Sequence, residues 1–437
     1  MVKHAPNSPR SVSVEEHLAR ILTAVTVLEP HEMALADAHG LVLAADVNAR
    51  VDVPGFDNSS MDGYAVRRAD VSTASAATPV MLKVVADVPA GSKLDPPLGP
   101  GEAARIMTGA PLPTDADAIV PVEDVTGGIE HGLGAEPPAT IDVLQPPSEA
   151  AFVRRIGSDV RAGDTVLRAS SMRTAGRALG ARDLAAAASA GVSQLLVQPA
   201  PRVGVLSTGS ELRPAGSPLE RGEIHDSNSV LITALITEAG GVPVPLGVVP
   251  DDESAFRSLL TDAAPHVDAI VTSGGVSVGA FDIVKAVLAR DGVWFGSVRM
   301  QPGKPQGFGA WAGAAAGAGA HPAPFIFALP GNPVSVFVSF EQFVRPALYV
   351  MRGRDDWARE TTTATAIESW NCPPGRRQYL PAILEGTPDA HTVRPASTGG
   401  SGSHLGASLA AANALAVVPE HVDKVRVGDR VDVTLIS

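Results

Sequence analysis

The chain has little cysteine, few aromatic residues and no long apolar run. Cys372 is the one cysteine among 437 residues, so neither an intrachain disulfide nor a thiolate cluster for zinc or iron can form. Such cysteine usage is typical of a cytoplasmic protein. The segment 1–20 lacks the apolar core of a signal peptide, and no apolar run reaches the roughly 20 residues that cross a bilayer. We therefore expect a cytoplasmic protein without membrane contact.

Positively charged residues are also fewer than negatively charged ones. There are 34 Lys and Arg residues against 47 Asp and Glu residues, which gives a formal net charge of −13. This balance argues against nucleic acid as a partner, because nucleic-acid binders normally carry a basic stripe. An anionic small molecule is not excluded, since a local pocket can be positive in an acidic protein.

The length of the chain and the changes in its residue pattern from one segment to the next predict a multidomain α/β protein. Residues 200–350 are expected to form a doubly wound, mostly parallel α/β domain, and residues 52–154 an inserted all-β module. Residues 351–437 are expected to form a small β-barrel-like domain. A mixed linker domain is expected to combine residues 11–51 and 155–199.

Periodicity supports this division. Near-continuous apolar strands alternate with helices between residues 200 and 350, as expected when helices cover both faces of a parallel sheet. The expected strands there are Val203–Ser207, Val242–Val249, Ala269–Thr272 and Phe325–Leu329. The expected helices are Ser13–Thr26, Leu179–Ser189, Ser229–Ala239, Asp252–Ala263, Phe281–Arg290 and Val334–Val350. Short strands are expected at Met81–Val85, Ala118–Val122, Thr140–Leu144, Thr361–Ile367, Gln378–Leu384, Ala414–Val418 and Arg430–Leu435.

Polar, glycine-rich segments follow three of the expected parallel strands, at Ser207–Glu211, Ser273–Gly279 and Pro330–Pro333. Glycines let main-chain N–H groups approach an oxyanion, and a following helix N-terminus adds partial positive charge. Ligands of doubly wound sheets bind outside the carboxyl ends of the strands. Each turn alone could be an ordinary strand–helix connection, but three at one sheet edge favour a phosphate-type site.

Carboxylates and one lysine accompany these segments. Glu211, Asp251 and Asp282 beside an anion site suggest Mg²⁺ held by oxygen ligands. Capping of a helix N-terminus is the alternative role for Asp251 and Asp282, and it is the favoured role for Asp226. Lys304, in a rigid Pro-Gly-Lys-Pro turn, is the best candidate for an anion contact, with a solvated turn lysine as the alternative.

Two further polar segments, 56–65 and 105–111, are explained from their residues alone as turn networks. No His-x₃-His or His-Glu-x-x-His spacing occurs, so zinc hydrolysis is not expected. A Gly-x-Ser-x-Gly elbow is also missing.

Taken together and in order, six segments resemble the molybdopterin molybdenumtransferase family, which includes the carboxy-terminal enzyme domain of gephyrin. The resemblance covers nearly the whole chain, and the segment around Met61 and Asp62 is its most specific part. The matching segments are Pro54–Val66 (PGFDNSSMDGYAV), Ile106–Pro113 (IMTGAPLP), Leu206–Leu212 (LSTGSEL), Ser273–Asp282 (SGGVSVGAFD), Gln301–Pro305 (QPGKP) and Leu329–Pro333 (LPGNP).

The resemblance implies an elongated homodimer whose cleft joins the α/β domain of one subunit to the β module of the other. It also implies the reaction, in which adenylated molybdopterin and molybdate give molybdenum cofactor and AMP with Mg²⁺. Contact with the adenylyltransferase that supplies the adenylate is a further expectation.

Family position gives roles to individual residues. The catalytic set is Asp62, Thr108, Glu211, Asp251 and Asp282, of which Glu211, Asp251 and Asp282 would hold the metal. The substrate-binding set is Ser273, Gly274, Gly275, Ser277, Gly279, Pro302, Lys304, Pro330, Asn332, Pro333, Arg376 and Ser403. Lys304, Arg376 and Ser403 would bind molybdate.

One departure concerns molybdate. Ser297 and Gln301 stand where many relatives carry lysine, and Arg299 is a candidate to compensate. Two other functions remain open: the related adenylyltransferase that activates molybdopterin with ATP, and a binding scaffold that has lost catalysis. The flanking β modules disfavour the first. The second is disfavoured because the expected catalytic residues are intact, namely Asp62, Thr108, Glu211, Asp251 and Asp282.

Overall fold

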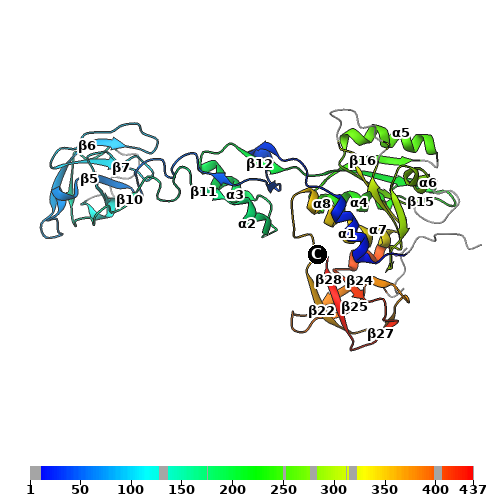
Figure 1. Cartoon of the computed structure of the whole chain (residues 1–437). Helices are drawn as coiled ribbons and strands as arrows, with labels where there is room; N and C mark the ends of the chain where they lie inside the picture. Colours follow the sequence, from blue (N-terminus) through cyan, green and yellow to red (C-terminus); the bar gives the residue numbers. More distant parts are fainter. Residues whose placement is uncertain are drawn as a thin grey trace, which may run out of the picture.

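The structure is a computed structural model that describes residues 11–126, 136–174, 176–249, 252–275, 283–311, 313, 322–397 and 406–436. Figure 1 shows an elongated molecule with a β module at one end and a narrow linker in the middle. The α/β domain and a C-terminal β domain lie together at the other end. The mixed α/β class, with several sheets and a small barrel, is confirmed.

The β module contains a five-stranded sheet in the order β8-β5-β7-β6-β9. Its strands are β5 (Gly63–Val66), β6 (Val80–Val88), β7 (Glu102–Ile106), β8 (Ala118–Pro121) and β9 (Thr140–Val143), and β4 (Asn58–Ser59) pairs with β10 (Val153–Arg154). Strand β5, which lies between β8 and β7, falls in the segment that we expected to be turns. A Cβ atom on Gly63 would lie 2.2 Å from the Val120 carbonyl oxygen, so close strand packing requires glycine there.

The linker is built from two separate chain segments. The order β1-β12-β2 joins β1 (His31–Ala34), β12 (Gln194–Gln198) and β2 (Val42–Leu43), and β3 (Val47–Asn48) pairs with β11 (Thr165–Leu167). Two helices, α2 (Ala169–Thr174) and α3 (Ala181–Ser189), accompany these strands. The core that they share includes Leu43, Leu179 and Val197, which come from both segments.

Helix α1 (Val14–Ala24) begins with a capping box, in which Ser13 Oγ accepts from Glu16 N–H and Glu16 accepts from Ser13 N–H. We expected residues 11–51 to belong to the linker, but α1 packs on the α/β domain. Val14 and Ile21 are buried in the same core as strands of that domain. The apolar face of α1 therefore packs against the α/β domain, although α1 is next to the linker in the sequence.

The α/β domain contains a six-stranded sheet in the order β16-β13-β17-β21-β20-β18. Four strands are parallel: β13 (Arg202–Thr208), β16 (Val242–Val249), β17 (Ala269–Ser273) and β21 (Phe325–Leu329). The other two, β18 (Trp294–Ser297) and β20 (Pro305–Ala310), add an antiparallel edge that the sequence analysis missed. The helices are α4 (Ser227–Glu238), α5 (Glu253–Ala263), α6 (Ile283–Arg290), α7 (Pro333–Ser339) and α8 (Arg345–Met351), and a π-helical turn (Phe340–Val344) joins α7 to α8.

Both faces of this sheet are covered by helices. Val271 of β17 packs in a core with α4, α7 and α8, whereas its neighbour Ile270 packs in a second core with α5 and α6. Successive side chains of a strand point to opposite faces, so near-continuous apolar strands are the expected result.

The C-terminal sheet has the order β19-β24-β25-β22-β28-β26, and a further β24–β26 pairing closes it into a small barrel. The strands are β19 (Met300–Gln301), β22 (Thr361–Ala366), β24 (Arg377–Glu385), β25 (Thr392–Pro395), β26 (Ala414–Val418) and β28 (Arg430–Leu435). Strand β19 comes from the α/β part of the chain, so one short segment takes part in the barrel sheet. Two small ladders complete the strands, β14 (Leu212–Arg213) with β15 (Ile224–His225) and β23 (Trp370–Asn371) with β27 (Lys424–Val425).

A buried arginine joins the α/β domain to the linker just after α8. Arg352 donates from Nη1 to the Ala239 carbonyl at 2.9 Å and from Nη2 to the Gly40 carbonyl at 2.7 Å. Burial lowers the pKa of its guanidinium, and the nearby Arg354 adds to that effect. Across the described ranges, no helix is long and apolar enough to span a membrane.

Candidate active site

Three loops converge at the carboxyl edge of the α/β sheet because β13, β17 and β21 are adjacent and parallel. The loop after β17 is held against its neighbour, since Gly274 N–H donates to the Leu329 carbonyl at 3.1 Å. Gly274 has φ +90°, and a Cβ atom there would lie 2.9 Å from the Thr208 carbonyl oxygen. Glycine is therefore required where these loops meet.

A buried hydroxyl network supports the loops from below. Ser207 Oγ lies 3.0 Å from Ser273 Oγ and 2.8 Å from Ser229 Oγ, and it donates to Asp226 at 3.2 Å. Asp226 also accepts from the Ser229 N–H at 3.0 Å, which confirms it as the N-cap of α4. The side chain of Ser273, predicted to bind substrate, thus points into this network and supports the loop that follows it.

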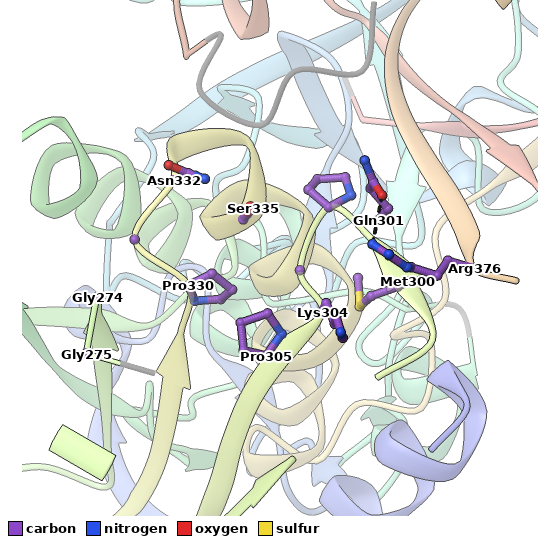
Figure 2. Close-up of a pocket in the computed structure, with 13 residues that line it drawn as sticks. Gly274, Gly275, Met300, Gln301, Lys304, Pro305, Pro330, Asn332, Ser335 and Arg376 are labelled. Atoms are coloured by element: carbon purple, nitrogen blue, oxygen red, sulfur yellow. Dashed lines mark hydrogen bonds between the residues drawn. The ribbon is translucent and has the colours of Figure 1, made fainter. Parts of the chain in front are cut away.

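A pocket of about 520 Å³ opens at this edge, between the loops and the barrel (Figure 2). Two of its lining residues, Lys304 and Arg376, are cations, and no carboxylate lines it within the described part of the chain. The lining residues are Gly274, Gly275, Met300, Gln301, Pro302, Gly303, Lys304, Pro305, Pro330, Gly331, Asn332, Ser335 and Arg376. The pocket thus presents positive charge in a protein that is acidic as a whole.

The turn that carries Lys304 is fixed by a buried amide. Gln306 Nε2 donates to the Gly303 carbonyl and to Ser339 Oγ, both at 2.7 Å. Gly303 has φ +100°, and a Cβ atom there would lie 3.0 Å from Ser339 Oγ. The turn runs from β19 in the barrel sheet to β20 in the α/β sheet, so Lys304 stands where the two sheets meet.

Arg376 and Arg377, at the beginning of β24, have different partners, and of the two only Arg376 lines the pocket. Arg376 Nη1 donates to Gln301 Oε1 at 3.0 Å (Figure 2), whereas Arg377 forms an ion pair with Glu15 of α1. Burial acts to raise the pKa of Glu15, but hydrogen bonds from its own backbone N–H and from Arg377 lower it overall. Burial raises the pKa of Tyr379, whose hydroxyl interacts with Arg377. Arg377 is thus neutralised within the structure.

Two residues near the turn do not enter the pocket. Arg299 donates from Nη1 to the Ser11 carbonyl at 2.9 Å, and its Nε lies 3.7 Å from Glu420. The carbonyl of Ser297 accepts from Val12 N–H at 2.9 Å. Arg299 therefore faces the N-terminal segment and does not replace the missing lysines.

Asp62 and Thr108 lie together, but in the distal β module. Asp62 Oδ1 accepts from Thr108 N–H at 2.7 Å and from Thr108 Oγ1 at 2.9 Å. These residues flank β5 and β7, at the end of the molecule opposite to the pocket (Figure 1). Within one chain, the structure joins the two residues to each other and not to Lys304 or Arg376.

The remaining expected site residues divide into two groups. Asp251, Ser277, Gly279, Asp282 and Ser403 lie outside the described residues. Glu211 is exposed after β13, with its carboxylate folded over Gly209, while Pro333 begins α7 beside the pocket lining. The N-cap of α5 is Asp252, which accepts from Ala255 N–H at 2.7 Å.

The sequence alone did not indicate that Ser335 lines the pocket, or that Gln301 lines it and binds Arg376. Ser335 is buried in the first turn of α7, so it lines the pocket from the helix that follows the expected Pro330–Pro333 turn. Its position two residues after that turn was an available signal. Gln301 was noted only as a substitution of a lysine.

These features define a multidomain α/β enzyme fold with a cationic pocket at a parallel sheet edge. Three family models match the chain: the MoeA N-terminal region (domain I and II) at residues 12–191, a probable molybdopterin binding domain at residues 204–349, and the MoeA C-terminal region (domain IV) at residues 363–436.

Relatives that match over nearly the full length of the chain point to the same family. The chain is 41% identical to molybdopterin molybdenumtransferase 2 of Mycobacterium tuberculosis over 96% of this chain and 98% of the relative. It is 33% identical to the molybdopterin molybdenumtransferase of a Nostoc species over 96% of this chain and 94% of that one. The crystal structure of a molybdopterin biosynthesis MoeA protein from Pyrococcus horikoshii superposes with a TM-score of 0.76 at 31% identity, covering 98% of this chain and 99% of that one. The chain therefore belongs to the molybdopterin molybdenumtransferase family and is an enzyme of molybdenum cofactor biosynthesis.

Proposed function

We propose that the enzyme inserts molybdate into adenylated molybdopterin and releases AMP in a Mg²⁺-dependent reaction. The observation that carries this proposal is the pocket at the sheet edge, which has two cations and no carboxylate among its described lining residues. An acidic protein with a cationic pocket is suited to bind a strongly anionic substrate. The names of the relatives then favour molybdopterin as the substrate class.

Each wall of the pocket suits a different part of the reactants. Gly274 and Gly275 line the pocket without side chains, so a phosphate group could approach the main chain closely there. Lys304 and Arg376 provide the cationic donors that a tetrahedral molybdate dianion requires. Bound side by side, molybdate and the dithiolene would react without first having to meet in solution.

Mg²⁺ fits the carboxylates that the sequence places around the loops. Glu211 is an exposed carboxylate beside the β13 loop and has no ion-pair partner in the described ranges. It would hold the metal together with Asp251 and Asp282, and the metal would neutralise charge at the phosphoanhydride bond that releases AMP. Lys304 and Arg376 would meanwhile keep molybdate oriented and shielded from bulk water.

A homodimer explains why the chain holds Asp62 and Thr108 so far from the pocket. The distal module and its junction with the linker expose large apolar side chains that include Phe56 (48% exposed), Met61 (36%), Phe152 (43%) and Ile156 (50%). Their segments are joined, because Ser60 N–H donates to the Phe152 carbonyl and Ile156 N–H donates to Asp57. Such an apolar surface beside Asp62 suits a protein interface, here with the second subunit, whose pocket Asp62 and Thr108 would complete.

The test uses purified full-length protein with adenylated molybdopterin, molybdate and Mg²⁺. Release of AMP, together with activation of a cofactor-free molybdoenzyme, is expected, and chelation of Mg²⁺ should stop both. Absence of AMP and of active cofactor would refute the insertase function. If ATP and molybdopterin gave the adenylate instead, the adenylyltransferase alternative would hold. Asp282→Asn should abolish turnover without unfolding the protein.

A further inference from the structure

Gln301 lies in the pocket wall at the end of β19, where its Oε1 accepts a hydrogen bond of 3.0 Å from Arg376 Nη1 (Figure 2). We propose that Gln301 is a positioning residue that holds the Arg376 guanidinium toward the bound oxyanion and so determines the affinity for the tetrahedral dianion. The inference rests on the proposed function, because it assigns a residue to the molybdate side of that reaction.

The two neighbouring arginines show why the identity of the partner matters. Arg377 pairs with the Glu15 carboxylate, so its charge is compensated inside the protein. Arg376 bonds to a neutral amide and has no carboxylate partner within the described ranges. A neutral acceptor fixes the orientation of the guanidinium and leaves its full positive charge for a ligand. Guanidinium has five N–H donors in a planar fork, so one bond to Gln301 leaves the others available.

Backbone pairing fixes both ends of this contact. Strands β19 and β24 are parallel neighbours, with Met300 opposite Arg377 and Gln301 opposite Gln378. Arg376 immediately precedes β24, and Pro302 immediately follows β19. The two side chains therefore meet because of strand register and not by chance contact between flexible loops.

The amide of Gln301 has a second use. Within the described residues its Nε2 makes no hydrogen bond, so its N–H donors remain available at the pocket wall. Lys304 follows three residues later on the fixed turn, and it too lines the pocket. Lys304, Arg376 and Gln301 thus offer an ammonium, a guanidinium and an amide to one anion.

Other side chains at position 301 would lose one of these properties. Glutamate would bond Arg376 more strongly, but it would neutralise the guanidinium and add negative charge beside a dianion. Leucine has a similar volume and would neither repel the anion nor hold Arg376. Lysine cannot accept a hydrogen bond from arginine. Among these four side chains, only the amide combines a neutral acceptor with a donor.

The experiment compares Gln301→Glu and Gln301→Leu with the wild type in two assays. The first titrates sodium molybdate into the full-length protein by calorimetry. The second measures AMP release while molybdate and adenylated molybdopterin are varied separately. Gln194→Glu and Gln194→Leu are the matched controls, since Gln194 is exposed on β12 of the linker and the chemical changes are the same.

For Gln301→Glu, the KM for molybdate should rise by about tenfold or more, because a carboxylate faces the dianion in a partly buried site. For Gln301→Leu, a rise of roughly threefold to tenfold is expected from the lost bond to a charged group. The KM for adenylated molybdopterin and the thermal midpoint should stay close to wild type. The Gln194 variants should match the wild type throughout.

The outcomes separate this inference from the proposed function. If the wild type neither binds molybdate nor releases AMP, the proposed function fails. If the wild type is active and both Gln301 variants keep its KM for molybdate, the function stands and the positioning role is wrong. Equal increases in both KM values would also overturn the assignment, because Gln301 would then act on the pocket as a whole.

Discussion

His17 should make the stability of the protein depend on pH below neutrality. This histidine lies on the buried face of α1, 1% exposed, between the rings of Trp294 and Phe343. Its Nδ1 has no hydrogen-bond partner in the described part of the chain. Burial lowers the pKa of His17 from 6.5 to about 3, and the positive charge of Arg20 adds to the effect.

The sign and size of the effect follow from proton linkage. Between pH 6.5 and about pH 3, the unfolded state binds a proton at His17 that the folded state does not, so stability falls as pH falls through this window. The loss at pH 5, relative to pH 8, is about 2 kcal/mol, and it grows by about 1.4 kcal/mol for each further pH unit. At pH 8 the imidazole is neutral in both states and contributes no pH dependence.

The assay is urea denaturation at pH 5 and pH 8, followed by the fluorescence of Trp294 and the other tryptophans. His17→Phe keeps an aromatic ring between Trp294 and Phe343 but removes the titrating group. Whatever its effect at pH 8, the variant should lose about 2 kcal/mol less than the wild type on going to pH 5. Equal losses in the two proteins would show that His17 takes up its proton in the folded state and would refute the reasoning.

Three other predictions concern contacts between domains or between subunits. Arg352→Met keeps the apolar stem but removes bonds of 2.9 and 2.7 Å to the carbonyls of Ala239 and Gly40, so urea denaturation should show a loss of about 3 kcal/mol; an unchanged midpoint would show that Arg352 does not stabilise the junction between the α/β domain and the linker. Gly303→Ala places a methyl group 3.0 Å from Ser339 Oγ at a φ of +100°, and calorimetry should show weaker molybdate binding with a loss of about 1–2 kcal/mol in stability. When inactive Asp62→Asn and Lys304→Met chains are mixed in equal amounts and allowed to pair at random, about a quarter of wild-type AMP release should be recovered, because about half of the dimers are heterodimers and each heterodimer has one of its two shared sites intact; no recovery would exclude a site shared between subunits.

The sequence predicted those elements whose pattern is local. The strands Val242–Val249 and Phe325–Leu329 have the bounds expected from their apolar runs, and α1 begins directly after its N-cap residue Ser13. Strand β5 escaped prediction, because Gly63 and its polar neighbours resemble a turn and only the close approach of β8 explains them.

In the site, too, residues with a local sequence pattern were predicted, whereas contacts between distant segments were not. Gly274 was recognisable because glycine-rich loops after parallel strands have a local signature, and Lys304 because it lies in a rigid Pro-Gly-Lys-Pro turn. The bond between Gln301 and Arg376 joins residues 75 positions apart, and it exists because β19 adds to the barrel sheet. No periodicity in either segment indicates that pairing. Gln301, which stands where many relatives carry a lysine, is in the structure the partner of Arg376, a cation that the barrel domain supplies.

The location of β19 has a consequence for how the pocket is kept in shape. Residues 300–301 pair with β24 of the barrel, and residues 307–310 pair with β21 of the α/β sheet. Lys304 stands on the turn between them, while Arg376 reaches the pocket from the barrel side. Any rotation of the barrel against the α/β domain would therefore change the separation of the two cations. The ion pair of Arg377 with Glu15 and the bond of Arg299 to Ser11 tie the same junction to the N-terminal segment. These contacts lie outside the pocket, yet they set the spacing of the cations on which recognition of a dianion depends.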